Sequence, residues 1–139
     1  MEFNKNDIED YKKRIVEDFM LKSVDQIKKE FSTDRICWAF VMWTYRSLNI
    51  FIQDEDRLKE LVKKFNRVEE KDLPYRFPDI VIFKNGSMLL GRHAGIMLDR
   101  KKFVHLGKDC NGLQFTDLTI LPWIHSDKVV IRHDEIYCT

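Results

Sequence analysis

The sequence has few cysteines and no long apolar run. Cys37, Cys110 and Cys138 contain no Cys-x-x-Cys pair and leave an odd count, which argues against a disulfide framework. No apolar stretch approaches the roughly 20 residues that a membrane span requires. Residues Met1–Asp10 also lack the basic start and apolar core of a signal peptide. We therefore expect a soluble chain with no membrane span that is cytoplasmic as synthesised.

Net charge is nearly absent as well. Lys and Arg number 24 against 23 Asp and Glu, which leaves a formal charge of +1 on 139 residues. Proteins that bind nucleic-acid phosphates or anionic membranes usually carry a clear basic excess, so we expect no nucleic-acid partner. Hydrophobic residues make up 44% of the chain. This length and composition predict one folded domain over residues 1–139.

The first part of the chain has the apolar spacing of helices. From Asp7 to Phe31 apolar residues recur mostly every three or four positions, which predicts one long N-terminal helix. Asn6 and Glu9 have the spacing of a capping box at its start. A shorter helix is predicted over residues 56–66 by the same periodicity.

A second helical stripe runs from Cys37 to Leu48 and closes near Asn49. Residues 32–34 (Ser-Thr-Asp) are good N-cap types, so Cys37 is expected in the first turn of this helix. The positive end of the helix dipole and the unpaired N–H groups there favour a thiolate. Cys37 is therefore a candidate nucleophile.

The second half of the chain predicts strands. Pro74 and Pro78 disfavour helix, and Asn85-Gly86 is a turn signal after a β-branched run. Helices followed by strands with short connections favour an α+β domain, in which a mainly antiparallel sheet packs against the N-terminal helices. We expect the strands at residues 80–83, 87–98, 102–106, 113–117 and 128–133.

Two histidines fall in consecutive predicted strands. A tight turn near residues 99–101 would place His93 and His105 side by side, with one imidazole as the base for the thiol and the other as its orienting partner. Residue types alone leave two other interpretations open. Cys37 and the histidines can be structural core groups, or the three can be ligands of a zinc ion, although they lack a paired-ligand spacing.

Five segments resemble the motifs of one family. They occur in its order and spacing, and they are Cys37–Val41, Tyr45–Ile50, Phe77–Phe83, His93–Leu98 and Lys102–His105. These runs look like the nucleophile motif, the Tyr-Arg-x-Leu-Gly-Ile run, the Pro-Gly-Asp-Leu-Val-Phe-Phe strand, the His-Val-Gly-Ile-Tyr-Leu strand and the third triad strand of NlpC-type cell-wall cysteine peptidases. The motifs resemble especially those of the phage-tail-associated members. The resemblance covers about residues 37–133.

The resemblance implies a papain-like fold with Cys37 as nucleophile, His93 as base and His105 as its orienter. It implies hydrolysis of amide bonds in peptidoglycan stem peptides, often between D-glutamate and the following diamino acid, without a metal or organic cofactor. A phage tail or a secretion system is the expected route and partner for delivery to the cell wall. Trp38 and Arg92 are candidate substrate contacts, and core packing is the alternative for Trp38.

Three departures from the family pattern keep other functions open. Ile36 and Ala39 stand where the family usually has Asp and Gly. Many members also have a tyrosine upstream of the cysteine that contributes to the oxyanion hole, but the one upstream tyrosine of this chain, Tyr11, is far from Cys37 in the sequence. A non-catalytic binding or assembly module of the same fold is one alternative. The other is amidase, deamidase or transacylase chemistry on a different amide or ester substrate with the same three residues.

Overall fold

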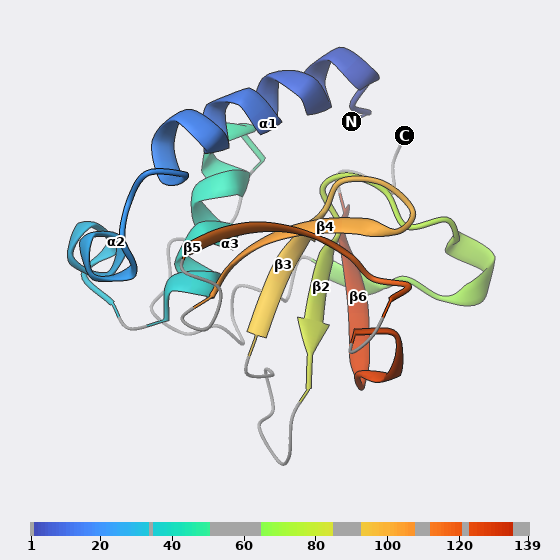
Figure 1. The fold of residues 1–139 in the computed structure, drawn as a ribbon. Coiled ribbons are helices and arrows are strands. Elements are labelled where there is room, and N and C mark those ends of the chain that lie inside the picture. Colours follow the sequence, from blue (N-terminus) through green and yellow to red (C-terminus); the bar gives the residue numbers. More distant parts are fainter. Residues whose placement is uncertain are drawn as a thin grey trace.

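The computed structural model describes residues 2–33, 35–50, 65–84, 93–107, 112–120 and 123–134. Helices occupy the first part of the chain and strands the second, as the hydrophobic spacing predicts (Figure 1). The helices are α1 (Lys5–Phe19), α2 (Val24–Phe31) and α3 (Ile36–Ser47), with short 3-10 helices η2 (Glu70–Asp72) and η4 (Trp123–His125). The strands are β1 (Phe65–Arg67), β2 (Ile80–Phe83), β3 (His93–Met97), β4 (Lys102–Gly107), β5 (Gly112–Asp117) and β6 (Lys128–His133).

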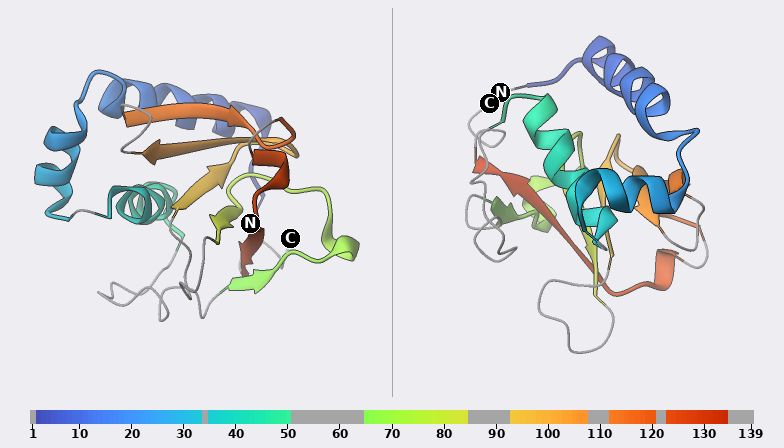
Figure 2. Two further views of the ribbon diagram at one scale, coloured as in Figure 1. Left: turned by 60° about the horizontal axis from the view of Figure 1, so that its bottom comes forward. Right: turned by 90° about the vertical axis from the view of Figure 1, so that its left-hand side faces the viewer.

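The strands form one antiparallel sheet in the order β1-β6-β2-β3-β4-β5. Helix α3 packs on β3 and β4, and α1 lies beside β5 (Figures 1 and 2). Alternating side chains give the sheet two apolar faces. One face, which includes Ala94 and Val104, packs with the helices, and the other includes Phe83 and Phe103. The predicted α+β class and its antiparallel sheet are confirmed.

The prediction of one continuous helix from Asp7 to Phe31 is wrong. Helix α1 ends at Phe19 and α2 begins at Val24. The break is stabilised by a capping box, in which the Ser23 hydroxyl accepts from the Gln26 N–H and the Gln26 side chain accepts from the Ser23 N–H. The apolar spacing indicates this break, because Phe19 and Val24 are five residues apart, whereas the apolar residues of one helix face recur every three or four positions.

Helix α1 also begins earlier than predicted. Asn4 is its N-cap and exchanges hydrogen bonds with Asp7, so the predicted box of Asn6 and Glu9 is wrong. Both pairs have the same spacing of three, and the sequence does not distinguish them. The apolar stripe itself is confirmed, because the residues that α1 buries against the core are Tyr11, Ile15 and Phe19.

Helix α3 forms as predicted but without the predicted cap. It starts at Ile36, and its N-cap residue Arg35 makes no side-chain capping bond, so the expectation of a cap at residues 32–34 is wrong. Ser32 instead ends α2 in the left-handed conformation, with a φ of 55°. Cys37 is the second residue of α3, which confirms its predicted place in the first helical turn.

The predicted helix over residues 56–66 is wrong at its end, and the rest of it lies outside the described residues. Phe65–Arg67 form β1 instead, opposite the end of β6. The Phe65 ring lies edge-on to His133, with centroids 5.0 Å apart, and packs on Tyr45 at 5.4 Å. An isolated apolar residue fits either period, and tertiary packing selects the strand.

The β3–β4 hairpin brings together the two segments that carry the paired histidines. Its turn is held by the Asp99 carboxylate, which accepts from the N–H groups of Lys101 at 2.9 Å and Lys102 at 2.7 Å. This confirms the tight turn predicted near residues 99–101. The other predicted strands are also confirmed within the described residues, and none of the helices described there is both long and apolar enough to cross a membrane.

Candidate active site

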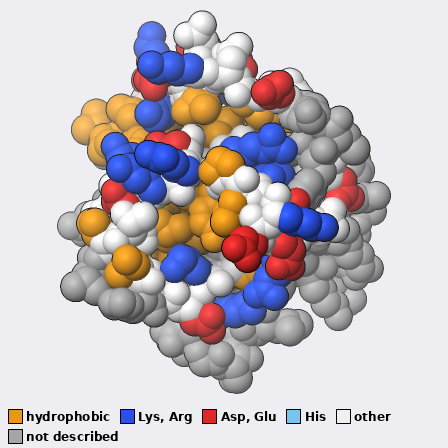
Figure 3. Space-filling view, turned by 90° about the vertical axis from the view of Figure 1, so that its right-hand side faces the viewer, with side chains coloured by type: hydrophobic (Ala, Val, Ile, Leu, Met, Phe, Trp, Pro, Cys, Tyr) orange, Lys and Arg blue, Asp and Glu red, His pale blue; other side chains and the backbone are white. Residues whose placement is uncertain are grey.

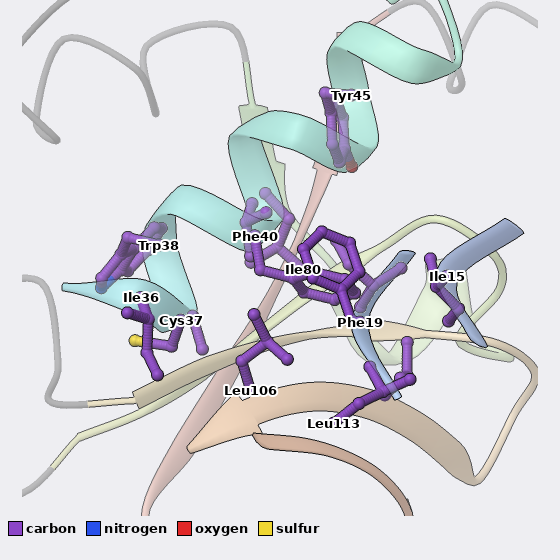
Figure 4. Packing of buried hydrophobic residues seen from close by; sticks show 14 of the residues in the cluster. Ile15, Phe19, Ile36, Cys37, Trp38, Phe40, Tyr45, Ile80, Leu106 and Leu113 are labelled. Atoms are coloured by element: carbon purple, nitrogen blue, oxygen red, sulfur yellow. The ribbon is translucent and has the colours of Figure 1, made fainter. Parts of the chain in front are cut away.

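Cys37 lies at the start of α3, where the helix meets the sheet. Its side chain is 8% exposed and belongs to the core cluster on the helical side of the sheet. Figure 4 shows Ile36, Cys37 and Trp38 together at the first turn of α3. The Cys37 thiol also hydrogen-bonds with the backbone of Ala94, the residue that follows His93 in β3. This contact places the thiol at the end of β3 that carries His93.

The environment of Cys37 favours the neutral thiol. Burial raises the pKa of the Cys37 thiol, and hydrogen bonds with the backbone of Ala94, Trp38 and Cys37 itself offset this only in part, together with the charge of Arg35. The backbone hydrogen bonds at the helix start lower the pKa of Cys37, as expected, but desolvation outweighs them. A nucleophilic Cys37 needs a base to take its proton.

His93 and His105 form a hydrogen-bonded pair, as predicted. The Nε2 atom of His93 lies 2.6 Å from the Nδ1 atom of His105, and the two rings are nearly perpendicular with centroids 4.7 Å apart. The contact joins the first residue of β3 to the middle of β4. On its other side, the Nε2 atom of His105 lies 2.9 Å from the hydroxyl oxygen of Thr116 in β5. Three strands thus hold one line of polar groups.

Aromatic rings enclose the buried member of this pair. Phe103 stacks on His105 with centroids 4.7 Å apart, and Trp123 of η4 approaches it edge-on at 5.5 Å. His105 is fully buried, and this burial, followed by the nearby His93, lowers the pKa of His105 to about 3. His105 is therefore neutral at physiological pH.

Gly95 provides the space that His105 occupies. A Cβ atom at position 95 would lie 2.9 Å from the carbonyl oxygen of Val104, 2.9 Å from the Phe103 ring and 3.2 Å from the Cβ of His105. Such distances are shorter than ordinary carbon contacts, and a backbone carbonyl cannot move aside easily. Glycine in the His-x-Gly run of β3 therefore allows β4 to hold His105 beside His93.

The structure adds two residues to the site that the sequence did not single out. Thr116 contacts His105 through its hydroxyl, and Trp123 covers both imidazoles, at 6.1 Å from His93 and 5.5 Å from His105 between centroids. A weak signal for Thr116 existed, because it lies in a predicted strand. Its face depends on the register, which pairs Thr116 with Phe103, and the sequence does not specify that register.

The remaining candidate residues lie elsewhere or outside the described residues. Trp38 is 3% exposed in the core, and its indole Nε1 has no hydrogen-bond partner within the described parts of the chain. Arg92, Cys110 and Cys138 lie outside the described residues. His133 is at the far end of β6, opposite Phe65. The described candidate site therefore has two parts: Cys37, which packs in the helical-side cluster beside the backbone of Ala94, and the hydrogen-bonded line from His93 to Thr116, whose imidazoles stack on Phe83 and Phe103 of the other cluster.

A cavity of about 510 Å³ opens at the other end of the β3–β4 hairpin. Its lining includes the turn residues Asp99, Arg100 and Lys101 and the ring of Phe77, and it includes neither Cys37 nor the paired histidines. On the face shown in Figure 3, Lys and Arg side chains border exposed hydrophobic ones. This cavity is therefore separate from the candidate nucleophile and its histidine pair. In the described ranges, no group of three or more His, Cys, Asp or Glu side chains is placed to hold a metal ion.

A model of the NlpC/P60 family matches residues 28–132, which is more than half of the chain and includes α3 and strands β1 to β5. No curated protein is similar enough to add to this comparison. Members of the family are generally cysteine peptidases that act on the cell wall, and the α+β fold agrees with their papain-like fold. The chain therefore belongs to the NlpC/P60 family.

Proposed function

We propose that this protein is a cysteine hydrolase that cleaves amide bonds in peptidoglycan stem peptides, with Cys37 as nucleophile and His93 as base. The observation that carries this proposal is the position of the thiol, which hydrogen-bonds with the backbone immediately after His93, while His93 itself bonds to His105. A thiol, an imidazole and a second group that orients the imidazole are the components of nucleophilic amide cleavage.

In the proposed first step, His93 takes the proton of the Cys37 thiol as the sulfur attacks the carbonyl carbon of the amide. The resulting oxyanion needs N–H donors. The first turn of α3 supports this role because no side chain caps it. The carbon–nitrogen bond then breaks, and His93 returns the proton to the leaving amine. A thioester joins the acyl part of the substrate to Cys37.

In the second step, His93 removes a proton from water as the water oxygen attacks the thioester carbonyl. The carbon–sulfur bond breaks, the proton passes to the sulfur, and the carboxylate product leaves. His105 stays neutral throughout, because its lowered pKa of about 3 prevents it from competing with His93 for the proton. The proposed bond is the one between D-glutamate and the diamino acid, which is the type implied by the family motifs.

The test uses synthetic stem peptides with this bond and follows the new amine by mass spectrometry. We expect cleavage by the native chain, none by Cys37→Ala, and unchanged cleavage by Cys110→Ala, which removes a different thiol. Circular dichroism checks that each variant is folded. Cleavage by Cys37→Ala at the native rate would refute the assignment of the nucleophile.

A second candidate is a binding module without turnover, and the burial of Cys37 and its raised pKa favour it. Alkylation by iodoacetamide at pH 7, measured for each cysteine by mass spectrometry, distinguishes the two. For a hydrolase, we expect Cys37 to react faster than Cys110 and Cys138, and His93→Ala to remove this advantage. A protected Cys37 would favour the binding module. A reactive Cys37 without stem-peptide cleavage would direct the search to other amides and esters.

A further inference from the structure

The line of polar groups does not end at the histidine pair. His105 is bonded on both ring nitrogens, with His93 at Nδ1 and the Thr116 hydroxyl at Nε2, at 2.6 Å and 2.9 Å. Thr116 is half-buried in β5 and lies opposite Phe103 of β4. Its hydroxyl therefore reaches His105 across the strand pair.

We propose that Thr116 is a positioning residue, whose hydroxyl accepts a hydrogen bond from the Nε2–H of His105 and thereby holds the Nδ1 atom of His105 as the acceptor for His93. This inference rests on the proposed function of Cys37 and His93. Thr116 acts through His105 and does not touch the substrate.

The number of protons on the two imidazoles determines which tautomer of His105 supports the base. A neutral imidazole has one N–H donor and one bare nitrogen, whereas an imidazolium has two N–H donors. When His93 accepts the proton of Cys37, both of its nitrogens become donors, so its Nε2–H must point at an acceptor. The atom at that position is Nδ1 of His105. His105 must then carry its single proton on Nε2, the atom that faces Thr116.

The opposite tautomer would disable the base. If His105 carried its proton on Nδ1, it would donate to His93, and a second proton on His93 would set two N–H groups against each other. The doubly protonated, charged form of His105 is disfavoured, because the ring is buried against Phe103 and Trp123. The hydroxyl of Thr116 can either donate or accept, and the productive arrangement assigns it the acceptor role at the outer nitrogen of His105.

The experiment measures the tautomer directly. Nitrogen-15 NMR of the histidine rings at pH 7 shows which nitrogen of His105 carries the proton, and the rate of Cys37 alkylation reports proton transfer to His93. We expect the native protein to have His105 protonated on Nε2. In Thr116→Val, which has nearly the same shape and no acceptor, we expect part of His105 to move its proton to Nδ1 and Cys37 alkylation to slow about tenfold.

Two variants separate positioning from packing. Thr116→Ser keeps the hydroxyl and should retain the native tautomer and an alkylation rate within about twofold of the native rate. Thr119→Val removes a hydroxyl that bonds Asp117 rather than a histidine. It should change neither the tautomer of His105 nor the rate of Cys37 alkylation. Thermal unfolding followed by circular dichroism shows that each variant is folded.

The proposal is overturned if His105 of the native protein carries its proton on Nδ1, a measurement that needs no variant. It is also overturned if Thr116→Val leaves the tautomer and the alkylation rate unchanged, or if Thr116→Ser slows alkylation as much as Thr116→Val does. The proposed function fails on a different result. Absence of stem-peptide cleavage by the native protein, with the Nε2 tautomer and a reactive Cys37 intact, contradicts the substrate and leaves the role of Thr116 supported.

Discussion

Arg132 of β6 and Asp79 before β2 form a buried, two-point ion pair. The Nε and one terminal nitrogen of Arg132 each lie 2.8 Å from a different carboxylate oxygen of Asp79, and both side chains are almost fully buried. Arg132 also donates to the carbonyl oxygens of Asp72 and Pro74, and Asp79 accepts from the N–H of Arg76. The pair thereby ties the segment before β2 to the neighbouring strand.

Removing one member of this pair should destabilise the fold strongly. We expect Asp79→Ala to lower the free energy of unfolding by about 3–5 kcal/mol, because it leaves the Arg132 charge buried without its partner. Urea unfolding followed by circular dichroism measures the loss. The double variant Asp79→Ala with Arg132→Met removes both charges and should lose less than Asp79→Ala alone. A loss below about 1 kcal/mol for Asp79→Ala would show that the pair is not needed for stability.

A second prediction concerns the hydroxyl pair that joins α1 to α3. Tyr11 and Thr44 are buried, and their hydroxyl oxygens lie 2.7 Å apart. We expect Thr44→Val to lower the free energy of unfolding by about 1–3 kcal/mol, since the Tyr11 hydroxyl then stays buried without its partner. Adding Tyr11→Phe removes that hydroxyl too and should recover part of the loss. Additive losses in this double-mutant cycle would argue against the hydrogen bond.

A third prediction concerns the contribution of His105 to the pH dependence of folding stability. Its pKa is lowered to about 3 in the folded protein against an ordinary value of 6.5, so the unfolded chain binds a proton that the folded chain does not. This contribution is fully present above about pH 6.5 and is lost as the pH falls from there towards 3, by up to about 1.4 kcal/mol per pH unit.

Urea unfolding at several pH values between 7 and 4 measures this slope. The variant His105→Gln lacks the titrating ring, so its stability should fall less steeply over the same range. The difference between the two curves isolates His105 from the carboxylates that also titrate in acid. Parallel curves for the native protein and the variant would show that His105 is not buried as a neutral ring.

A fourth prediction concerns Ile36, which stands directly before Cys37 where the family pattern has Asp. The family pattern has Asp at this position, but the Ile36 side chain is 3% exposed in the core. We expect Ile36→Asp to lower the free energy of unfolding by about 2–5 kcal/mol, because it loses apolar packing and buries a carboxylate. Ile36→Val keeps the apolar character and should lose only about 0.5–1.5 kcal/mol. If both variants are equally stable, the packing of Ile36 does not explain the departure.

The sequence predicted the elements whose local patterns are unambiguous. The stripe from Cys37 has the helical period, and the run at residues 80–83 is β-branched and lies between Pro78 and the Asn85-Gly86 turn signal; both predictions are confirmed. The boundary at Ser23 and the strand at Phe65 were missed, since a cap spacing or a single apolar residue fits several arrangements. The proximity of His93 and His105 was predictable because a tight turn connects their strands.

By itself, the sequence determined the α+β class, the place of Cys37 in the first turn of a helix and the order of the motifs that match the NlpC/P60 family. Tertiary structure alone decided the chemistry of the site. Strand register placed Thr116 behind His105, and burial outweighed the expected effect of the helix terminus on the pKa of Cys37. The physical reason is that periodicity and capping act between residues close in the chain, whereas desolvation and cross-strand hydrogen bonds exist only after distant segments have packed.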